Sequence, residues 1–273
     1  FTHDAELKEI IQQAEDQLME CQLKNGYIGD YDEKHQLKGW DVWGRKYTLL
    51  GLIKWYWETG DKNALKSATR LLDYTMTQVG PGKKSILDCG EYVGMPPSSI
   101  LEPTMFMYQI TKQERYLDFA KYIAEELNKP DGPQLITNAN VPVALRRPLK
   151  PGDAWYGKKN GQKAYEMMSC YVGLLELFRV TGDPDLLKSA EITWQHIVDE
   201  EINVCGSGAS HECWYGGRAL QTRVSALTME TCVTFTWMQF CERLLEFTGD
   251  PKYVDQIERT MYNALMASMK ADG

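Results

Sequence analysis

The stretch LFRVTGDPDLLKSAEITW, Leu177–Trp194, has the pattern of one apolar helix ending, a tight turn at Thr181, and a second helix beginning. Gly182 suits the left-handed residue that closes a helix, because glycine has no Cβ to oppose that backbone conformation. Asp183 suits the N-cap of the next helix, and Pro184 suits its first position. The stretch therefore predicts a hairpin of two helices.

The same pattern occurs at three other places, with the turn at Thr59, Thr111 or Thr248. These segments are YWETGDKNALKSATRLLDY, MYQITKQERYLDFAKYI and LLEFTGDPKYVDQIERTMY. Two of the three turns repeat the glycine and the aspartate, and Pro251 again suits a first helical position. The turns are too irregularly spaced for a solenoid of short repeats, so they predict hairpins separated by long loops.

The first helix of each hairpin is the more apolar one, as in VWGRKYTLLGLIKWYW, MMSCYVGLLELF and CVTFTWMQFCERLLEF. Apolar helices sheathed by amphipathic ones predict an all-α fold, an α/α toroid with inner and outer helices. We expect the inner helices to begin near Asp41, Glu102, Tyr165 and Thr228. The short turns then gather on one face and the long loops on the other, where function usually lies.

The composition is that of a folded globular protein: 273 residues, of which 43% are hydrophobic and 25% charged. A net charge of −8 provides no basic face for a phosphate backbone, so nucleic acid is not an expected partner. No segment approaches the roughly 20 consecutive apolar residues of a membrane span, so no membrane partner is expected. Seven cysteines at irregular spacings do not resemble a disulfide framework. The compartment stays open, with a bacterial cytoplasm and periplasm both compatible.

A carboxylate stands at or near the start of every predicted inner helix, namely Asp41, Glu102, Glu166 and Glu230. One account is local, because an acidic side chain in a first turn interacts favourably with the helix dipole by roughly 0.3–1 kcal/mol. The other account is functional, because four carboxylates on the long-loop face can line one concave pocket. We predict that the four side chains converge.

Aromatic residues accompany these carboxylates in the loops. A sugar ring stacks its C–H face on an aromatic side chain while its hydroxyl groups bond to charged acceptors, which predicts a carbohydrate site; packing in the core or the loops is the competing account. The aromatic candidates are Trp40, Trp43, Tyr92, Trp155, Tyr156, Tyr165, Trp214 and Tyr215.

Glycoside cleavage in its common form uses two carboxyl groups, an acid for the leaving oxygen and a nucleophile or base opposite it. Glu212 and Glu230 are the first candidates for this catalytic pair. Glu212 lies among His211, Cys213 and Trp214, where apolar neighbours would favour its protonated form. The competing account is a solvated loop glutamate.

Cys232 follows Glu230 by two residues, which places a sulfur and an oxygen near the start of one helix. Both can bind zinc, and the helix dipole favours a thiolate at that position. Zinc normally has four ligands, and no other cysteine or histidine motif accompanies this pair. The spacing by itself therefore indicates a metal only weakly.

Three segments, GWDVWGRKYTLLGLIKWYWETGD, METCVTFTWMQF and IERTMYNALMASMKADG, resemble glycoside hydrolase family 127, the β-L-arabinofuranosidase-like group. The resemblance spans nearly the whole chain. It implies an (α/α)6-type toroid over residues 1–273, incomplete in this chain, in a longer protein whose β-sandwich domains are absent here. It also implies release of L-arabinofuranose or a related sugar from plant-type glycans, with zinc holding a cysteine nucleophile.

Carried over by position, the resemblance implies Glu230 and Cys232 as zinc ligands and Glu212 as the acid/base. It places Glu102, Asp41 and Trp43 toward the sugar. We add further candidates for substrate binding from the same loops, namely Tyr165, Glu166, His211 and Trp214. The remaining zinc ligands and the nucleophile are expected beyond residue 273, so the 273-residue chain is expected to be inactive alone.

The chain departs from the family at QKAYEMMSCYVG, where relatives carry histidines and this chain has Lys163, Tyr165 and Glu166. Two other functions stay open. A polysaccharide lyase or sugar epimerase would use Tyr165, Tyr215 or His211 as a base. A non-catalytic carbohydrate-binding toroid would use the carboxylates only as helix caps.

Overall fold

The computed structural model describes residues 4–146, 163–220 and 228–270. The described ranges hold helices and a few isolated β-bridges, with no strand, which confirms the all-α class. The helices are α1 Ala5–Glu20, α2 Asp41–Thr59, α3 Lys62–Gln78, α4 Met95–Ser98, α5 Leu101–Thr111, α6 Glu114–Leu127, α7 Ala164–Thr181, α8 Pro184–Glu200, α9 Gly217–Leu220, α10 Thr231–Thr248 and α11 Lys252–Thr260. Short 3-10 turns η1 Ile86–Asp88, η2 Tyr92–Gly94 and η3 Val143–Leu145 and the π-helical turn η4 Met261–Leu265 complete them.

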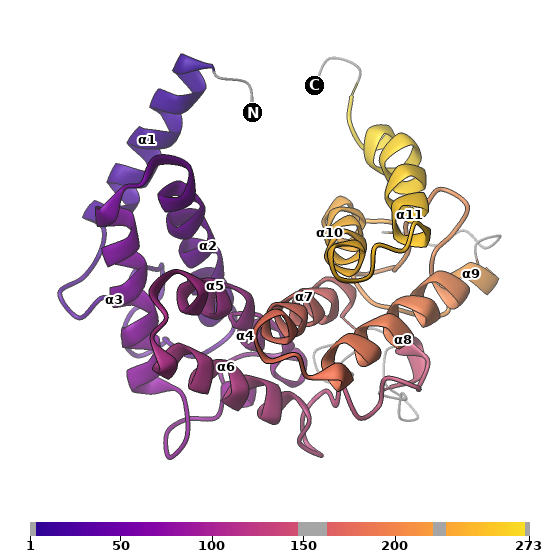
Figure 1. The fold of residues 1–273 in the computed structure, drawn as a ribbon, viewed down its shortest axis with the longest axis horizontal. Coiled ribbons are helices and arrows are strands. Elements are labelled where there is room, and N and C mark those ends of the chain that lie inside the picture. Colours follow the sequence, from indigo (N-terminus) through magenta and orange to yellow (C-terminus); the bar gives the residue numbers. More distant parts are fainter. Residues whose placement is uncertain (1–3, 147–162, 221–227, 271–273) are drawn as a thin grey trace.

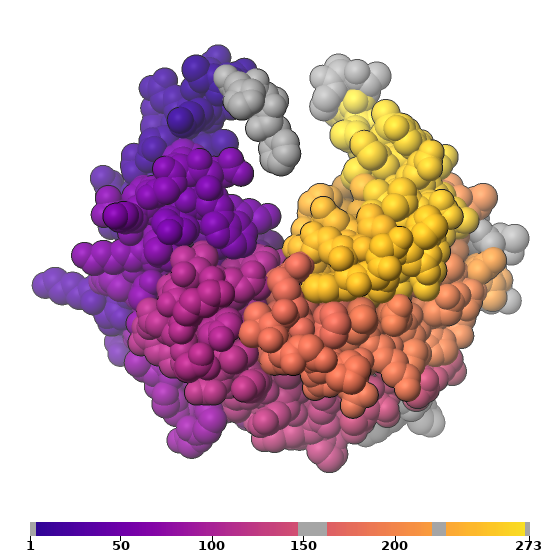
Figure 2. Space-filling model, viewed as in Figure 1, coloured from indigo at the N-terminus to yellow at the C-terminus, as the bar shows by residue number. Residues whose placement is uncertain are grey.

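The helices form an open arc with α1 near one end and α11 at the other (Figure 1). Helices α2, α5, α7 and α10 lie on the inner side and contact one another in that order. Each of them packs against the helix that follows its hairpin turn, α3, α6, α8 or α11. The space-filling surface is hollowed between the two ends of the arc (Figure 2). The inner and outer layers predicted from the sequence are thus confirmed.

The hairpin turns use the predicted capping residues. Gly60, Gly182 and Gly249 close the inner helices in the left-handed conformation, with φ between 66° and 74°. Lys112 takes the same role after α5 with φ 55°. The Asp183 side chain accepts a hydrogen bond from the backbone N–H of Asp185, as expected of an N-cap.

Three inner helices begin where the sequence predicts, at Asp41, Leu101 and Ala164. Helix α10 begins at Thr231, later than the expected Thr228, because Met229 is left-handed with φ 56° and Glu230 is extended. Helix α11 also begins later, at Lys252, so Pro251 is its N-cap rather than its first residue.

Neighbouring inner helices run in the same direction, so their starts lie on one face of the arc and their turns on the opposite face. Near the turns, the rings of Phe178 on α7 and Phe247 on α10 lie 5.2 Å apart. Near the starts, the rings of Trp43 on α2 and Tyr165 on α7 lie 5.1 Å apart. The starts of these inner helices, with the described residues just before them, therefore share one face, as predicted.

One continuous core of buried apolar side chains joins the two layers. At Gly173 a Cβ would lie 2.9 Å from the Leu101 Cβ and 3.0 Å from the backbone nitrogen of Glu102. Gly173 lies in the middle of α7, so the missing Cβ lets the start of α5 pack closely against that part of α7. In the described part of the chain, no helix combines the length and the apolar character that crossing a membrane requires.

Candidate functional site

Three of the four carboxylates predicted to converge lie around the starts of α5, α7 and α10. Glu102 stands on the first turn of α5, Glu166 on the first turn of α7, and Glu230 caps the start of α10. Lys46 of α2 lies between the first two: its Nζ is 3.9 Å from Glu102 Oε2, and it also interacts electrostatically with Glu166. Glu212 interacts electrostatically with both Glu166 and Glu230.

Asp41 does not join this cluster. Its Oδ1 accepts a hydrogen bond from the Tyr27 hydroxyl at 2.8 Å. Its Oδ2 accepts bonds from the Leu37 backbone N–H at 2.8 Å and from the Arg45 guanidinium at 2.7 Å. Because both oxygens are used inside the protein and Asp41 is buried, the expectation that its side chain faces a sugar is corrected.

Glu212 reaches the cluster through a tight turn, 209–213, in which Ala209, His211 and Glu212 all have left-handed φ angles of 47° to 64°. The turn is fixed on one side by the Ala164 N–H, which donates to the Glu212 carbonyl oxygen at 2.8 Å. On the other side the Met229 N–H donates to the Ala209 carbonyl oxygen at 3.3 Å. The turn therefore bridges the starts of α7 and α10.

The backbone of this turn also contacts the second candidate catalytic residue. The Glu212 N–H donates a hydrogen bond to the Glu230 carboxylate, which favours the ionised form of Glu230. Burial acts in the opposite direction and dominates, and the negative charge of Glu212 adds to it, so the pKa of Glu230 is raised. His211 contributes a favourable electrostatic interaction with Glu230. The backbone of the turn 209–213 thus brings Glu212 and Glu230 together.

Lys163, the residue before α7, is the cation at the centre of the cluster. Its ammonium group hydrogen-bonds to the Glu212 carboxylate and lies 3.6 Å from Glu166 Oε1. The same Nζ lies 4.6 Å from the centre of the Tyr92 ring. Burial would lower the pKa of Lys163, but attraction to Glu166 and Glu212 outweighs it and the pKa is raised.

Glu166 and Glu212 occupy different environments. Glu166 is buried, and burial raises its pKa to about 6 although Lys163 acts to lower it. The Glu212 side chain is 48% exposed and paired with Lys163. The side chains of its neighbours Cys213 and Trp214 are themselves buried. The expectation that apolar neighbours enclose the Glu212 carboxyl group is therefore wrong, because that group is half-exposed.

An aromatic wall stands beside the carboxylates, formed by side chains of α2, the residue before it, and α7. Ring centroids are 5.8 Å apart for Trp40 and Trp43, and 5.3 Å apart for Trp43 and Tyr47. The hydroxyl groups of Tyr47 and Tyr165 are hydrogen-bonded. Trp40 and Tyr47 are exposed, so this wall offers ring surface for stacking.

Sequence reasoning missed Lys46 and Tyr47. They follow Trp43 at helical spacing on α2, and the Lys46 Nζ lies 4.8 Å from the centre of the Trp43 ring. The spacing places Lys46 and Tyr47 on the same side of α2 as Trp43. It does not show that Lys46 pairs with Glu102, because that contact depends on how α5 packs against α2. Trp214 is fully buried in the core, which corrects the expectation that its ring is open to a sugar. Trp155 and Tyr156, named above among the aromatic candidates, lie outside the described residues.

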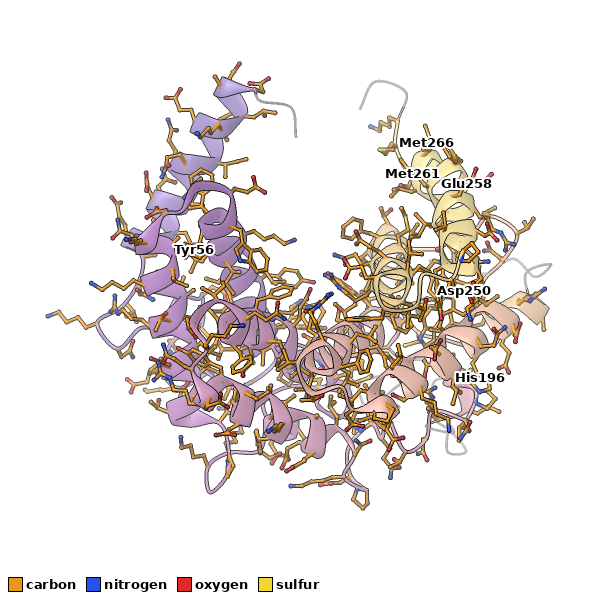
Figure 3. The ribbon with its side chains drawn as sticks, in the orientation of Figure 1. Tyr56, His196, Asp250, Glu258, Met261 and Met266 are labelled. Carbon is orange, nitrogen blue, oxygen red and sulfur yellow. The ribbon has the colours of Figure 1, made fainter. Side chains whose placement is uncertain are left out.

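Histidines in the described part of the chain lie mostly elsewhere. His35 is paired with an exposed aspartate, Asp32, in the loop before α2. His196 stands on the outer helix α8, away from the inner helices (Figure 3). His211, next to Glu212, is the histidine that the fold brings to the cluster.

The candidate zinc ligands Glu230 and Cys232 stand at the start of α10, and Cys232 is exposed. Burial and then the charge of Glu230 raise the pKa of the Cys232 thiol, so the free thiol form is favoured. Over the ranges that the structure describes, no group of three His, Cys, Asp or Glu side chains is arranged to hold a metal ion. Glu230 and Cys232 supply two donors of the usual four.

The fold is the α/α toroid found among glycoside hydrolases, with its carboxylates and aromatic rings at the long-loop face. The sequence profile of the β-L-arabinofuranosidase GH127 catalytic domain matches residues 1–273. The chain belongs to glycoside hydrolase family 127, and the resemblance inferred from three short segments is confirmed.

Individual relatives are distant. The chain is 21% identical over 303 residues to the non-reducing end β-L-arabinofuranosidase of Bifidobacterium longum subsp. longum, covering 99% of this chain and 44% of that protein. A GH127 β-L-arabinofuranosidase from Geobacillus stearothermophilus T6 is similar in structure, with a TM-score of 0.73, 19% identity, and coverage of 100% of this chain and 45% of that one.

The likeness extends to another glycoside hydrolase family. An inactive variant of the GH76 α-1,6-mannanase of Salegentibacter sp. gives a TM-score of 0.63 at 16% identity, over 96% of this chain and 70% of that one. The chain spans less than half the length of the GH127 relatives described above.

Proposed function

We propose that this chain is the catalytic domain, or part of it, of a glycoside hydrolase that releases L-arabinofuranose or a related sugar from plant-type glycans. The observation that carries the proposal is the pairing of Glu212 with Glu230 beside an exposed aromatic wall, in a chain that belongs to family 127. Two carboxyl groups at one place can protonate a leaving oxygen and support the opposite side of the reacting carbon.

In the proposed mechanism Glu212 transfers the proton, because its side chain is 48% exposed and more accessible than that of Glu230. The ammonium group of Lys163 is bonded to the Glu212 carboxylate in the resting site, so Glu212 takes up a proton before it protonates the glycosidic oxygen, and Lys163 then stabilises the carboxylate that forms again. Glu230 lies behind it, hydrogen-bonded to the Glu212 backbone, and is available to the reacting carbon or to a metal.

We further propose that Glu230 and Cys232 contribute to a zinc site in the full-length protein. An oxygen and a sulfur at one helix start are both donors that zinc accepts, and zinc would supply Lewis-acid charge stabilisation there. The role of this chain's own residues is limited to holding the ion beside Glu212.

The described side chains favour a neutral sugar over a uronic acid. Lys46 and Lys163 are both buried and each already faces a carboxylate, so neither offers a free positive charge. What is exposed toward a ligand is the Glu212 carboxylate and the rings of Trp40 and Tyr47. The carboxylate of a uronic acid would be repelled by the negative charge of the Glu212 carboxylate.

The lyase or epimerase alternative needs a strong base on Tyr165, Tyr215 or His211. Burial raises the pKa of Tyr165 and of Tyr215, which makes an ionised tyrosine base less accessible. The Tyr165 hydroxyl is moreover engaged with Tyr47. These features favour hydrolysis.

The test is a panel of aryl glycosides and arabinose-containing oligosaccharides incubated with the full-length protein. The proposal expects release of L-arabinofuranose or a related neutral sugar, with no absorbance from an unsaturated product. An unsaturated product identifies a lyase, and carbohydrate binding without cleavage identifies a non-catalytic toroid; either result overturns the proposal.

A further inference from the structure

Lys163 joins three parts of the chain that are far apart in sequence. Its ammonium group is bonded to Glu212 in the turn 209–213, lies 3.6 Å from Glu166 on α7, and lies over the ring of Tyr92 from η2. A second ring, that of Trp40, is 5.5 Å away. The Lys163 side chain is only 4% exposed, so these contacts replace its hydration.

We infer that Lys163 is a positioning residue, which holds the side chain of Glu212 beside Glu230, with the buried Glu166 as its counter-charge. The inference rests on the catalytic role proposed for Glu212. It predicts that Lys163 acts on turnover through Glu212.

The two ends of this ion pair differ in mobility. Glu212 has a half-exposed side chain on a turn, and such a side chain samples several rotamers unless a partner fixes it. Lys163 is enclosed by Tyr92, Trp40 and Glu166, and its own backbone forms a bridge with Cys213 in the turn. The enclosed lysine therefore determines where the mobile carboxylate lies.

Glu166 explains why a lysine is tolerated at this depth. A buried ammonium group without a counter-charge is costly. Glu166 supplies a negative charge on the buried side of Lys163, and Glu212 supplies one on the exposed side. Glu166 itself is buried and lies next to the equally buried Lys163. The three charged residues Glu166, Lys163 and Glu212 therefore form a row that runs from the core to the exposed surface of the site.

The first experiment is a double-mutant cycle in the full-length protein with an aryl glycoside that the wild type cleaves. Lys163→Met is expected to lower kcat by about 10- to 100-fold while KM changes by less than about threefold, because a misplaced group costs mainly the chemical step. Lys163→Arg keeps the charge and is expected to recover part of the loss. In a Glu212→Gln background, Lys163→Met is expected to lower kcat by less than about threefold further.

Lys46→Met is the matched control. Like Lys163, Lys46 is buried and lies over an aromatic ring. It differs in lying on α2 and in facing Glu102, at 3.9 Å, and not Glu212. Its effect on kcat is expected to be the same in the wild-type and Glu212→Gln backgrounds. If Lys163→Met is equally independent of Glu212, Lys163 supports the fold in general and the inference is wrong.

A second measurement does not depend on activity. Hydrogen exchange of the peptide 205–216 is expected to become faster in Lys163→Met and to stay unchanged in Lys46→Met, because the first variant alone releases the turn. Unchanged exchange in Lys163→Met overturns the inference even if the protein hydrolyses glycosides. A wild type that cleaves no glycoside, but whose turn is released by Lys163→Met, sinks the proposed function and leaves the positioning of Glu212 standing.

Discussion

The backbone N–H of Ala164, the first residue of α7, donates a hydrogen bond to the carbonyl oxygen of Glu212 at 2.8 Å. This bond fixes a loop that precedes α10 against the start of α7, and it places the Glu212 side chain next to Lys163. The candidate site therefore depends on backbone contacts between segments that are far apart in the chain.

Glu212→Gln should remove the proposed proton donor. Turnover of substrates with poor leaving groups should fall by roughly 10²- to 10⁴-fold, while activated aryl glycosides, whose leaving oxygen needs little protonation, should lose much less. Steady-state kinetics across a series of leaving groups measures this. An equal loss for all leaving groups contradicts the assignment and moves the proton-transfer role to another carboxyl group, with Glu230 first.

Glu230→Ala and Cys232→Ser should both lower the zinc content of the full-length protein if these residues are ligands, since loss of a donor weakens the site. Elemental analysis of purified protein, taken before any kinetic assay, gives the metal per chain. Cys21→Ser is the matched control, because Cys21 is also exposed but lies at the end of α1. Full zinc occupancy in both variants contradicts the assignment of these ligands.

Glu166→Gln should change how stability depends on pH. The pKa of Glu166 is about 6 in the folded protein against 4.5 for the ordinary group, so the native state binds more protons between these values. The free energy of unfolding therefore falls as pH rises from about 4.5 through 6, by roughly 2 kcal/mol in total.

The Glu166→Gln variant cannot ionise at this position and should lack that fall. Urea unfolding at pH 4.5 and pH 7.5 should show the variant gaining on the wild type by about that amount at the higher pH. The attraction between Lys163 and ionised Glu166 already acts in the pKa of about 6, so it adds no separate pH dependence. Glu125→Gln, on the exposed side of α6, provides the control. Parallel pH profiles for wild type and Glu166→Gln are incompatible with this prediction.

Glu201→Ala should destabilise the loop that follows the turn 209–213. The buried Glu201 carboxylate accepts hydrogen bonds of 2.8 to 3.1 Å from the backbone N–H groups of Tyr215, Gly216 and Gly217. Removing the acceptor leaves these donors without it, at an expected cost of roughly 2 to 4 kcal/mol in the free energy of unfolding.

The adjacent Glu200 provides the control for that measurement. Its side chain is partly exposed and lies 3.6 Å from His196, so Glu200→Ala should cost less than about 1 kcal/mol. Chemical denaturation compares the two variants directly. Equal stability of Glu201→Ala and Glu200→Ala would show that the three backbone contacts contribute little.

Asp41→Asn should act on stability and not on substrate affinity. Asp41 and Arg45 form a fully buried ion pair, and breaking such a pair typically costs about 3 to 5 kcal/mol because a charge is left uncompensated. KM of the folded fraction should be unchanged. Asp61→Ala, which removes the N-cap of α3, provides the comparison and should lower the free energy of unfolding by about 1 kcal/mol. A large rise in KM with little loss of stability would return Asp41 to the sugar site.

The sequence by itself determined the hairpins, their inner and outer helices, and the carboxylates at the helix starts. Gly182 and Asp183 could be interpreted locally because the hydrogen bonds that cap a helix join residues only a few positions apart. Glu230 and Cys232 were likewise placed at the start of a helix by their spacing.

Tertiary structure alone decided which of those carboxylates share a site. Asp41 stands at a helix start like Glu166, yet Arg45, one helical turn further along α2, binds its carboxylate inside the protein. Lys163 and Glu212 meet only because the turn 209–213 folds back onto the start of α7. Such contacts depend on packing between helices far apart in sequence, and no local pattern of residues records that packing.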